Sequence, residues 1–141
     1  MHHVRKLSFV AALVLALASI TARAEDQKKH DLKDLEPTVD AALKAYNEQD
    51  WKAFYKDYAK MMAGIATEQA FGTMYKGMYW PKYGKYESKK LIDKESVLLG
   101  DMPLLVYEAK FEKAEKVKVS INFTTEEGKL KLMQVQFNEI K

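Results

Sequence analysis

The feature that most constrains the fold is a change of hydrophobic period part-way along the chain. Before about residue 80, apolar residues recur every three or four positions, as on one face of a helix. Beyond residue 103 they alternate with polar residues, most regularly in segment 117–123, as in a strand with one face on a core. Helices followed by strands predict an α+β fold, in which N-terminal helices pack on the concave face of a curved antiparallel sheet.

The first half of the chain predicts three helices. The first covers residues 31–46, with Pro37 either in its first turn or at a kink. Asp50 is a suitable N-cap for a second helix that continues to the Met61–Met62 pair. A third helix is expected to follow Thr67 and to end at Pro81.

The second half predicts a meander of strands. One strand is expected to start after a chain reversal at Gly84, and a short one is expected at residues 96–99. Residues 126–129 have the composition of a hairpin turn. The apolar phase slips by one residue near Leu132, which predicts a β-bulge in the last strand.

The first 24 residues have the pattern of a signal peptide. Arg5 and Lys6 precede an apolar run at 7–20, and Ala22 and Ala24 supply small residues for cleavage after Ala24. The run is shorter than the roughly 20 residues that cross a bilayer. We therefore expect a periplasmic or secreted protein that has no membrane contact after cleavage.

The remaining sequence divides into a leader and one domain. Residues 25–30 are expected to form a flexible leader in which His30 is solvated. Residues 31–141 are long enough for a single domain with its own core.

Composition excludes several functional classes. Beyond residue 24 the chain has twenty lysines, no arginine and twenty acidic residues, so nucleic acid is not an expected partner. There is no cysteine in the sequence, which removes thiolate metal sites and a cysteine nucleophile. No metal or other cofactor is predicted.

Two motifs carry a resemblance to a known superfamily. Residues 45–51 read AYNEQDW at a predicted helix junction, and residues 83–86 read YGKY at the start of the sheet. With the meander rich in lysine and glutamate, the chain resembles small bacterial secreted proteins of the NTF2-like, or cystatin-like, α+β cone superfamily over about residues 32–140. It is most similar to exported members whose domain has no assigned function. The resemblance implies a cone with a pocket at its open end; some members are isomerases, dehydratases or epoxide hydrolases, and others are binding or dimerisation modules.

A cluster of aromatic residues is the candidate binding site. The same rings have an alternative interpretation as a lid on the core, because aromatic side chains bury large areas. The function we expect is that of an exported, non-catalytic domain that binds a small apolar ligand or a protein partner in an aromatic-rich cone opening. The candidate ligand-binding residues are Tyr75, Tyr79, Trp80, Tyr83, Tyr86 and Tyr107.

No catalytic residue is predicted. A capping role accounts for Asp50, and Glu108, Lys89 and Lys90 are expected on the solvated surface of the sheet. Two alternatives stay open: a small isomerase or hydrolase that uses a tyrosine with a buried acid, and a structural module that forms a homodimer through the outer face of the sheet.

Overall fold

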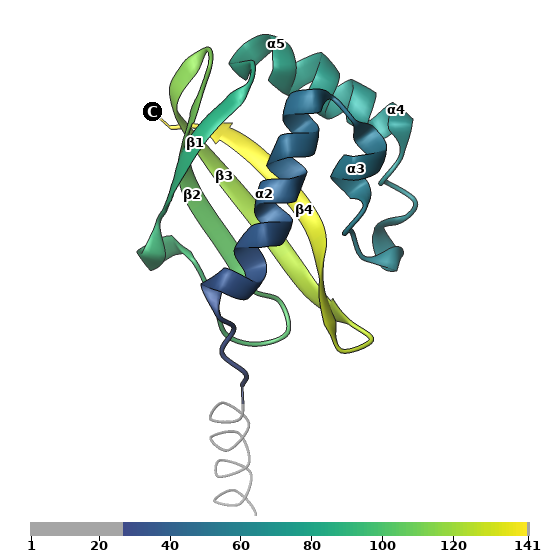
Figure 1. Cartoon of the computed structure of the whole chain (residues 1–141), viewed down its shortest axis with the longest axis vertical. Helices are drawn as coiled ribbons and strands as arrows, with labels where there is room; N and C mark the ends of the chain where they lie inside the picture. Colours follow the sequence, from purple (N-terminus) through teal and green to yellow (C-terminus); the bar gives the residue numbers. More distant parts are fainter. Residues whose placement is uncertain (1–26, 141) are drawn as a thin grey trace, which may run out of the picture.

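The computed structural model describes residues 27–140, so the predicted signal peptide and its cleavage point lie outside the described residues. The described part is α+β, with helices packed on an open four-stranded antiparallel sheet (Figure 1). The strands lie side by side in their order along the chain, without a crossover. They are β1 (Tyr86–Leu91), β2 (Leu104–Phe111), β3 (Ala114–Glu126) and β4 (Lys129–Glu139).

The first helix, α2 (Leu32–Glu48), lies across the sheet in Figure 1. Its N-cap is Asp31, whose side chain accepts a hydrogen bond from the Lys33 backbone N–H at 3.1 Å. The helix starts well before Pro37, so Pro37 lies inside the helix rather than in its first turn.

The second helix is shorter than the sequence predicts. α3 (Trp51–Tyr55) begins after the Asp50 cap, as expected, but it ends well before Met62. The chain leaves the helix because its backbone pairs with β4: Ala59 N–H donates to the Leu132 carbonyl, and Leu132 N–H donates to the Asp57 carbonyl, both at 2.8 Å. A single 3₁₀ turn, η1 (Lys60–Met62), follows.

The third helix changes its hydrogen-bond pattern twice. It consists of α4 (Glu68–Phe71), the π-helix η2 (Gly72–Tyr79) and α5 (Trp80–Tyr83). The prediction that Pro81 ends this helix is wrong, since Pro81 lies in the first turn of α5, where its missing N–H is tolerated. The helix ends at Gly84, whose φ of +70° favours glycine and where a Cβ would lie 2.5 Å from a Glu112 carboxylate oxygen.

The C-terminal half agrees closely with its alternating pattern. Glu127 and Gly128, with φ of 53° and 77°, form the turn between β3 and β4. The register of these strands shifts at Asn122 and Phe123, opposite Leu132, which confirms the predicted bulge. Residues 96–99 form isolated bridges and no strand of the sheet.

The core lies between the helices and one face of the sheet. The inward rows of β2, β3 and β4 are buried, as at Tyr107, Val119 and Phe137. The outward rows are polar and more exposed, as at Glu108 and Gln136. This one-sided burial is typical of an antiparallel sheet with a solvated face.

The end of the predicted leader is held against the domain. His30 is 9% exposed, its backbone N–H donates to Leu98 O at 2.7 Å, and its Nε2 lies 2.6 Å from Gly100 O. Gly100 N–H donates to the Lys28 carbonyl at 2.9 Å. The expectation of a solvated His30 is therefore wrong, because residues 28–30 pair with the loop before β2.

Candidate functional site

The structure divides the six aromatic candidates into two environments. Tyr75, Tyr83 and Tyr107 are buried in the core, whereas Tyr79, Trp80 and Tyr86 are partly buried against it. The Tyr79 ring contacts those of Tyr75 and Tyr83, and the Tyr86 ring contacts Phe111, so these rings fill space between helices and sheet. The geometry fits the interpretation of these rings as a lid on the core.

Tyr75 is the centre of this aromatic packing. Its ring centroid lies 4.3 Å from that of Phe54 and 5.4 Å from those of Phe71 and Tyr79. Its hydroxyl donates a hydrogen bond to the Val135 carbonyl on β4. Burial raises the pKa of Tyr75, and so does the neighbouring Tyr58. The hydroxyl therefore remains a neutral donor at ordinary pH and is unsuited to act as a base.

The AYNEQDW motif fixes the start of the sheet. The Asn47 side-chain amide donates to the Tyr86 carbonyl at 2.8 Å, and its oxygen accepts from the Tyr86 N–H at 2.7 Å. The Tyr46 hydroxyl donates to Gly84 O at 2.7 Å, and its ring makes an edge contact with Trp80 at 5.4 Å. The two sequence motifs are thus joined to each other, and their observed role is structural.

The charged side chain of Lys89 lies between α2 and the sheet. Lys89 is only 12% exposed in its side chain, and its Nζ lies 2.6 Å from an Asp40 oxygen and 4.0 Å from a Glu36 oxygen. The expectation of a solvated Lys89 is wrong, because this residue pairs with Ala109 in the inward row and points toward α2. Lys90 is exposed, as expected.

The surroundings of Lys89 keep it charged. Desolvation lowers the pKa of Lys89, but the hydrogen bond to Asp40 and the nearby negative charges outweigh it, so the pKa is raised on balance. Its Nζ lies 5.2 Å from the ring centroid of Tyr107, whose buried hydroxyl has no hydrogen-bond partner among the described residues. A protonated amine is not a nucleophile, so this group is an ion pair rather than a reactive lysine.

Two hollows follow the free edge of β4. The first, which we call the Tyr55 hollow, has a volume of about 240 Å³. The second, the Tyr79 hollow, has about 350 Å³. We call the two together the β4 seam. The Tyr55 hollow is lined by Tyr55, Tyr58, Ile65, Ala70, Met74, Tyr75, Met133 and Gln134. The Tyr79 hollow is lined by Met78, Tyr79, Lys82, Tyr83, Gln136, Phe137, Asn138 and Glu139.

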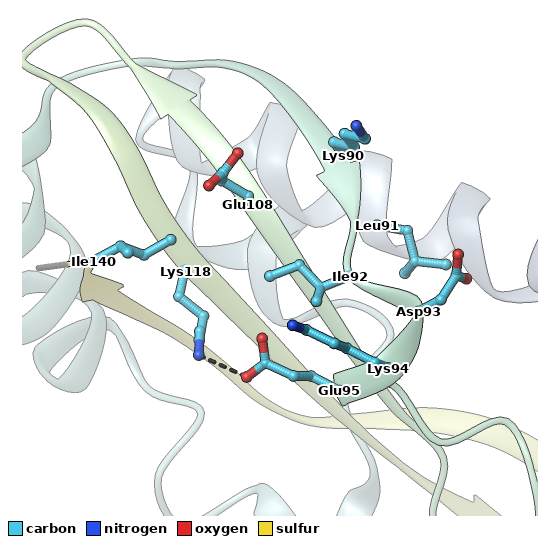
Figure 2. Close-up of a pocket in the computed structure, with 9 residues that line it drawn as sticks. All are labelled: Lys90, Leu91, Ile92, Asp93, Lys94, Glu95, Glu108, Lys118 and Ile140. Carbon is cyan, nitrogen blue, oxygen red and sulfur yellow. Dashed lines mark hydrogen bonds and ion pairs between the residues drawn. The ribbon is translucent and has the colours of Figure 1, made fainter.

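Two other hollows lie away from the β4 edge. The larger, of about 590 Å³, is on the outer face of the sheet (Figure 2). There Lys118 Nζ lies 2.7 Å from a Glu95 oxygen, and Glu108 and Lys90 come from neighbouring strands. The other, of about 510 Å³, lies beside residues 28–31. Charges of both signs line these hollows, as on an ordinary solvated surface.

Two searches of the described residues have negative results. No group of three or more histidine and acidic side chains within residues 27–140 is arranged to hold a metal ion. Over the same residues, none of the helices has the length and hydropathy needed to cross a bilayer.

Comparison with known proteins gives no relative. No protein-family model, curated protein or solved structure matches the chain. The resemblance to NTF2-like proteins therefore stays a prediction from the sequence.

The sequence pattern did not locate the β4 seam. The second helix predicted from the sequence includes both Tyr55 and Tyr58, but α3 stops at Tyr55 and both residues border the Tyr55 hollow. Met74 and Met78, four residues apart, line the two hollows and are both exposed. The four-residue spacing of the two methionines was the available sequence signal. The direction in which their side chains point depends on the π-helical geometry of η2.

Proposed function

We propose that the chain is an exported, non-catalytic binding domain of the NTF2-like cone type. Its binding site is the Tyr55 hollow, which takes a small apolar ligand or an apolar side chain of a protein partner. The single observation behind this proposal is a hollow of tyrosine rings and methionine thioethers beside a sheet edge.

The lining suits apolar binding. Methionine is flexible and polarisable, so Met74 and Met133 can adapt to ligands of different shape. The Tyr55 and Tyr58 rings offer apolar faces, and burial raises the pKa of both hydroxyls, which therefore remain neutral. A volume of about 240 Å³ is below the usual range for drug-sized ligands, so it suits a single ring or side chain.

The cone and the export route remain part of the proposal. Three helical stretches precede a four-stranded meander, which is the element order that the resemblance implies. Export is supported by the basic, apolar and small-residue pattern of residues 1–24.

Binding is better supported than catalysis. The partly buried ion pair of Lys89 with Asp40 lines none of the four hollows. Lys82 and Glu139 do line the Tyr79 hollow, but both side chains are more than half exposed and they pair with each other at 3.7 Å. The tyrosines beside the Tyr55 hollow are held in their neutral form, whereas a general base must accept a proton near the operating pH. No observation therefore favours the isomerase or hydrolase alternative.

The test is binding to the mature chain of the neutral apolar fluorophore N-phenyl-1-naphthylamine, whose phenyl group is the single ring that would enter the hollow. We expect saturable binding that weakens by about tenfold in Met74→Gln, since the thioether surface is lost from the hollow. Ala70→Phe should also weaken binding, because the added ring occupies the hollow that Ala70 lines.

The matched control is Met102→Gln. Met102 is 58% exposed and lines none of the four hollows, so this variant should bind the fluorophore like the native protein. Absence of binding, or an equal loss in Met74→Gln and Met102→Gln, would overturn the proposal.

A further inference from the structure

We infer that Met74 is a redox-sensitive modification site in the wall of the Tyr55 hollow. Peroxides convert its thioether to a sulfoxide, and the sulfoxide weakens the binding of apolar groups in the hollow. The inference rests on the proposed function, because it concerns how binding at the same site is controlled. It holds whichever apolar group enters the hollow.

Methionine supplies all the sulfur of this chain. The sequence has seven methionines and no cysteine, and all the methionines except Met1 lie within the described residues. A peroxide oxidises a thioether only where it can reach the sulfur, so exposed methionines react first. The well-exposed ones are Met61, Met74, Met78 and Met102.

Met74 combines exposure with a place in the hollow. It lines the Tyr55 hollow and is 39% exposed, so a small oxidant has access to it from solvent. Met133 lines the same hollow but is less exposed. Met61 and Met102 are more exposed than Met74, but they line none of the four hollows. Oxidation of Met74 is therefore the modification that reaches the binding site first.

The reaction is an oxygen-atom transfer from a peroxide. A lone pair of the sulfur attacks one oxygen of hydrogen peroxide, and the S–O bond forms as the O–O bond breaks. The departing hydroxide takes the proton of the transferred oxygen and leaves as water. The sulfur is oxidised to the sulfoxide and the peroxide is reduced. A methionine sulfoxide reductase reverses the step with a dithiol, which becomes a disulfide while the oxygen leaves as water.

The sulfoxide makes this part of the hollow polar. Its oxygen is a hydrogen-bond acceptor that water solvates, so an apolar ligand has to displace that water to enter. The Tyr75 hydroxyl, in the same lining, cannot replace the water, because it already donates to the Val135 carbonyl. Met74 lies outside the buried core, so its sulfoxide stays solvated when the hollow is empty. We therefore expect oxidation to weaken binding without unfolding the chain.

The experiment measures binding of N-phenyl-1-naphthylamine to the mature chain before and after treatment with hydrogen peroxide. Peptide mass spectrometry quantifies the sulfoxide at each methionine, and circular dichroism monitors the fold. We expect the affinity to fall by about tenfold as Met74 is oxidised. Methionine sulfoxide reductases for both sulfoxide epimers, supplied with dithiothreitol, should restore it.

Two leucine variants locate the effect. Met74→Leu has no sulfur at this position, so the same peroxide treatment should change its own affinity by less than about twofold. The matched control is Met102→Leu, which removes an exposed sulfur away from the hollow and should lose affinity on oxidation as the native protein does.

The outcomes separate this inference from the proposed function. If the untreated protein binds the fluorophore and its affinity is unchanged once Met74 is oxidised, the proposed function stands and the inference fails. An equal loss in Met74→Leu, a loss that occurs only with unfolding, or oxidation of Met133 before Met74 would also overturn the inference. If the untreated protein does not bind the fluorophore, both proposals fail.

Discussion

The two edges of the sheet are protected in different ways. β1 is short, with six residues, and its inward Lys89 pairs with carboxylates on α2. β4 has eleven residues, and its edge is covered by the backbone of residues 57–59 and by the Tyr75 hydroxyl. Short length and inward charges are known ways to prevent pairing with another chain. At β4 the backbone of residues 57–59 and the Tyr75 hydroxyl achieve the same end by pairing with the Leu132 backbone and with the Val135 carbonyl.

This difference explains why binding is proposed at only one edge. Charge at β1 protects the strand and leaves a polar surface around it. At β4, Tyr75 reaches the backbone and brings an apolar ring with it, and the methionines of η2 border the hollows along this edge. Protection by aromatic residues therefore creates an apolar seam, and protection by charge does not.

The largest expected effect is loss of the fold at high pH. Burial raises the pKa of Tyr46, Tyr58, Tyr75 and Tyr107 above the ordinary value of 10.0, so they ionise fully only on unfolding. Their contribution to stability is complete below pH 10 and is lost as the pH rises, at about 1.4 kcal/mol per pH unit for each tyrosine. Absorbance at 295 nm and circular dichroism should change together above pH 10. Separate transitions, with the tyrosines ionised before the fold is lost, would contradict this.

Removing the Tyr75 ring should have the next largest effect. Tyr75→Ala leaves a cavity among packed rings and frees the Val135 carbonyl, so we expect a loss of about 3–5 kcal/mol in the free energy of unfolding. Urea denaturation measures it. The comparison at the other edge is Tyr86→Ala, which removes a partly buried ring and should cost about 1–2 kcal/mol. If Tyr75→Ala and Tyr86→Ala lost similar free energies of unfolding, the two edges would not differ as described.

The alternating half of the chain was the easier part to predict. The strand from 117 to 123 and the bulge near Leu132 follow from side-chain period alone, because a strand reverses its facing at every residue. The helical half was harder, since tertiary contacts overrode local signals. α3 stops where its continuation pairs with β4, and a π-helix carries the third helix past Pro81.

The candidate site was predictable in kind but not in place. The sequence identified tyrosines near the third helix, and Tyr75 does line a hollow. Which rings face the core and which border a hollow depends on the rotation of η2, and π-helical hydrogen bonds leave no clear periodic signal in the sequence. The sequence also contains no sign that the Lys89 side chain points inward, because its partners on α2 are about fifty residues away in the chain.

A smaller change tests the Tyr75 hydroxyl alone. Tyr75→Phe keeps the ring but leaves the buried Val135 carbonyl without its donor, which should cost about 1–2 kcal/mol. The same substitution on the β1 side, Tyr107→Phe, removes a buried hydroxyl that has no partner among the described residues. That variant should be neutral or slightly more stable. Urea denaturation of both variants would show opposite signs; a loss in Tyr107→Phe as large as in Tyr75→Phe would indicate a hidden partner for Tyr107.

The smallest effect is expected at Lys89. Lys89→Met retains an apolar stem over the Tyr107 ring and removes an ion pair whose Asp40 side chain is 58% exposed. Because solvent screens such pairs, we expect a change of no more than about 1 kcal/mol. A double-mutant cycle with Asp40→Asn should give a coupling of about 0.5–1 kcal/mol that shrinks in high salt. A coupling energy as large as the loss in Tyr75→Ala would show that β1 depends on its charges as strongly as β4 depends on its tyrosines. The two edges would then be equivalent in energy, although their chemistry differs.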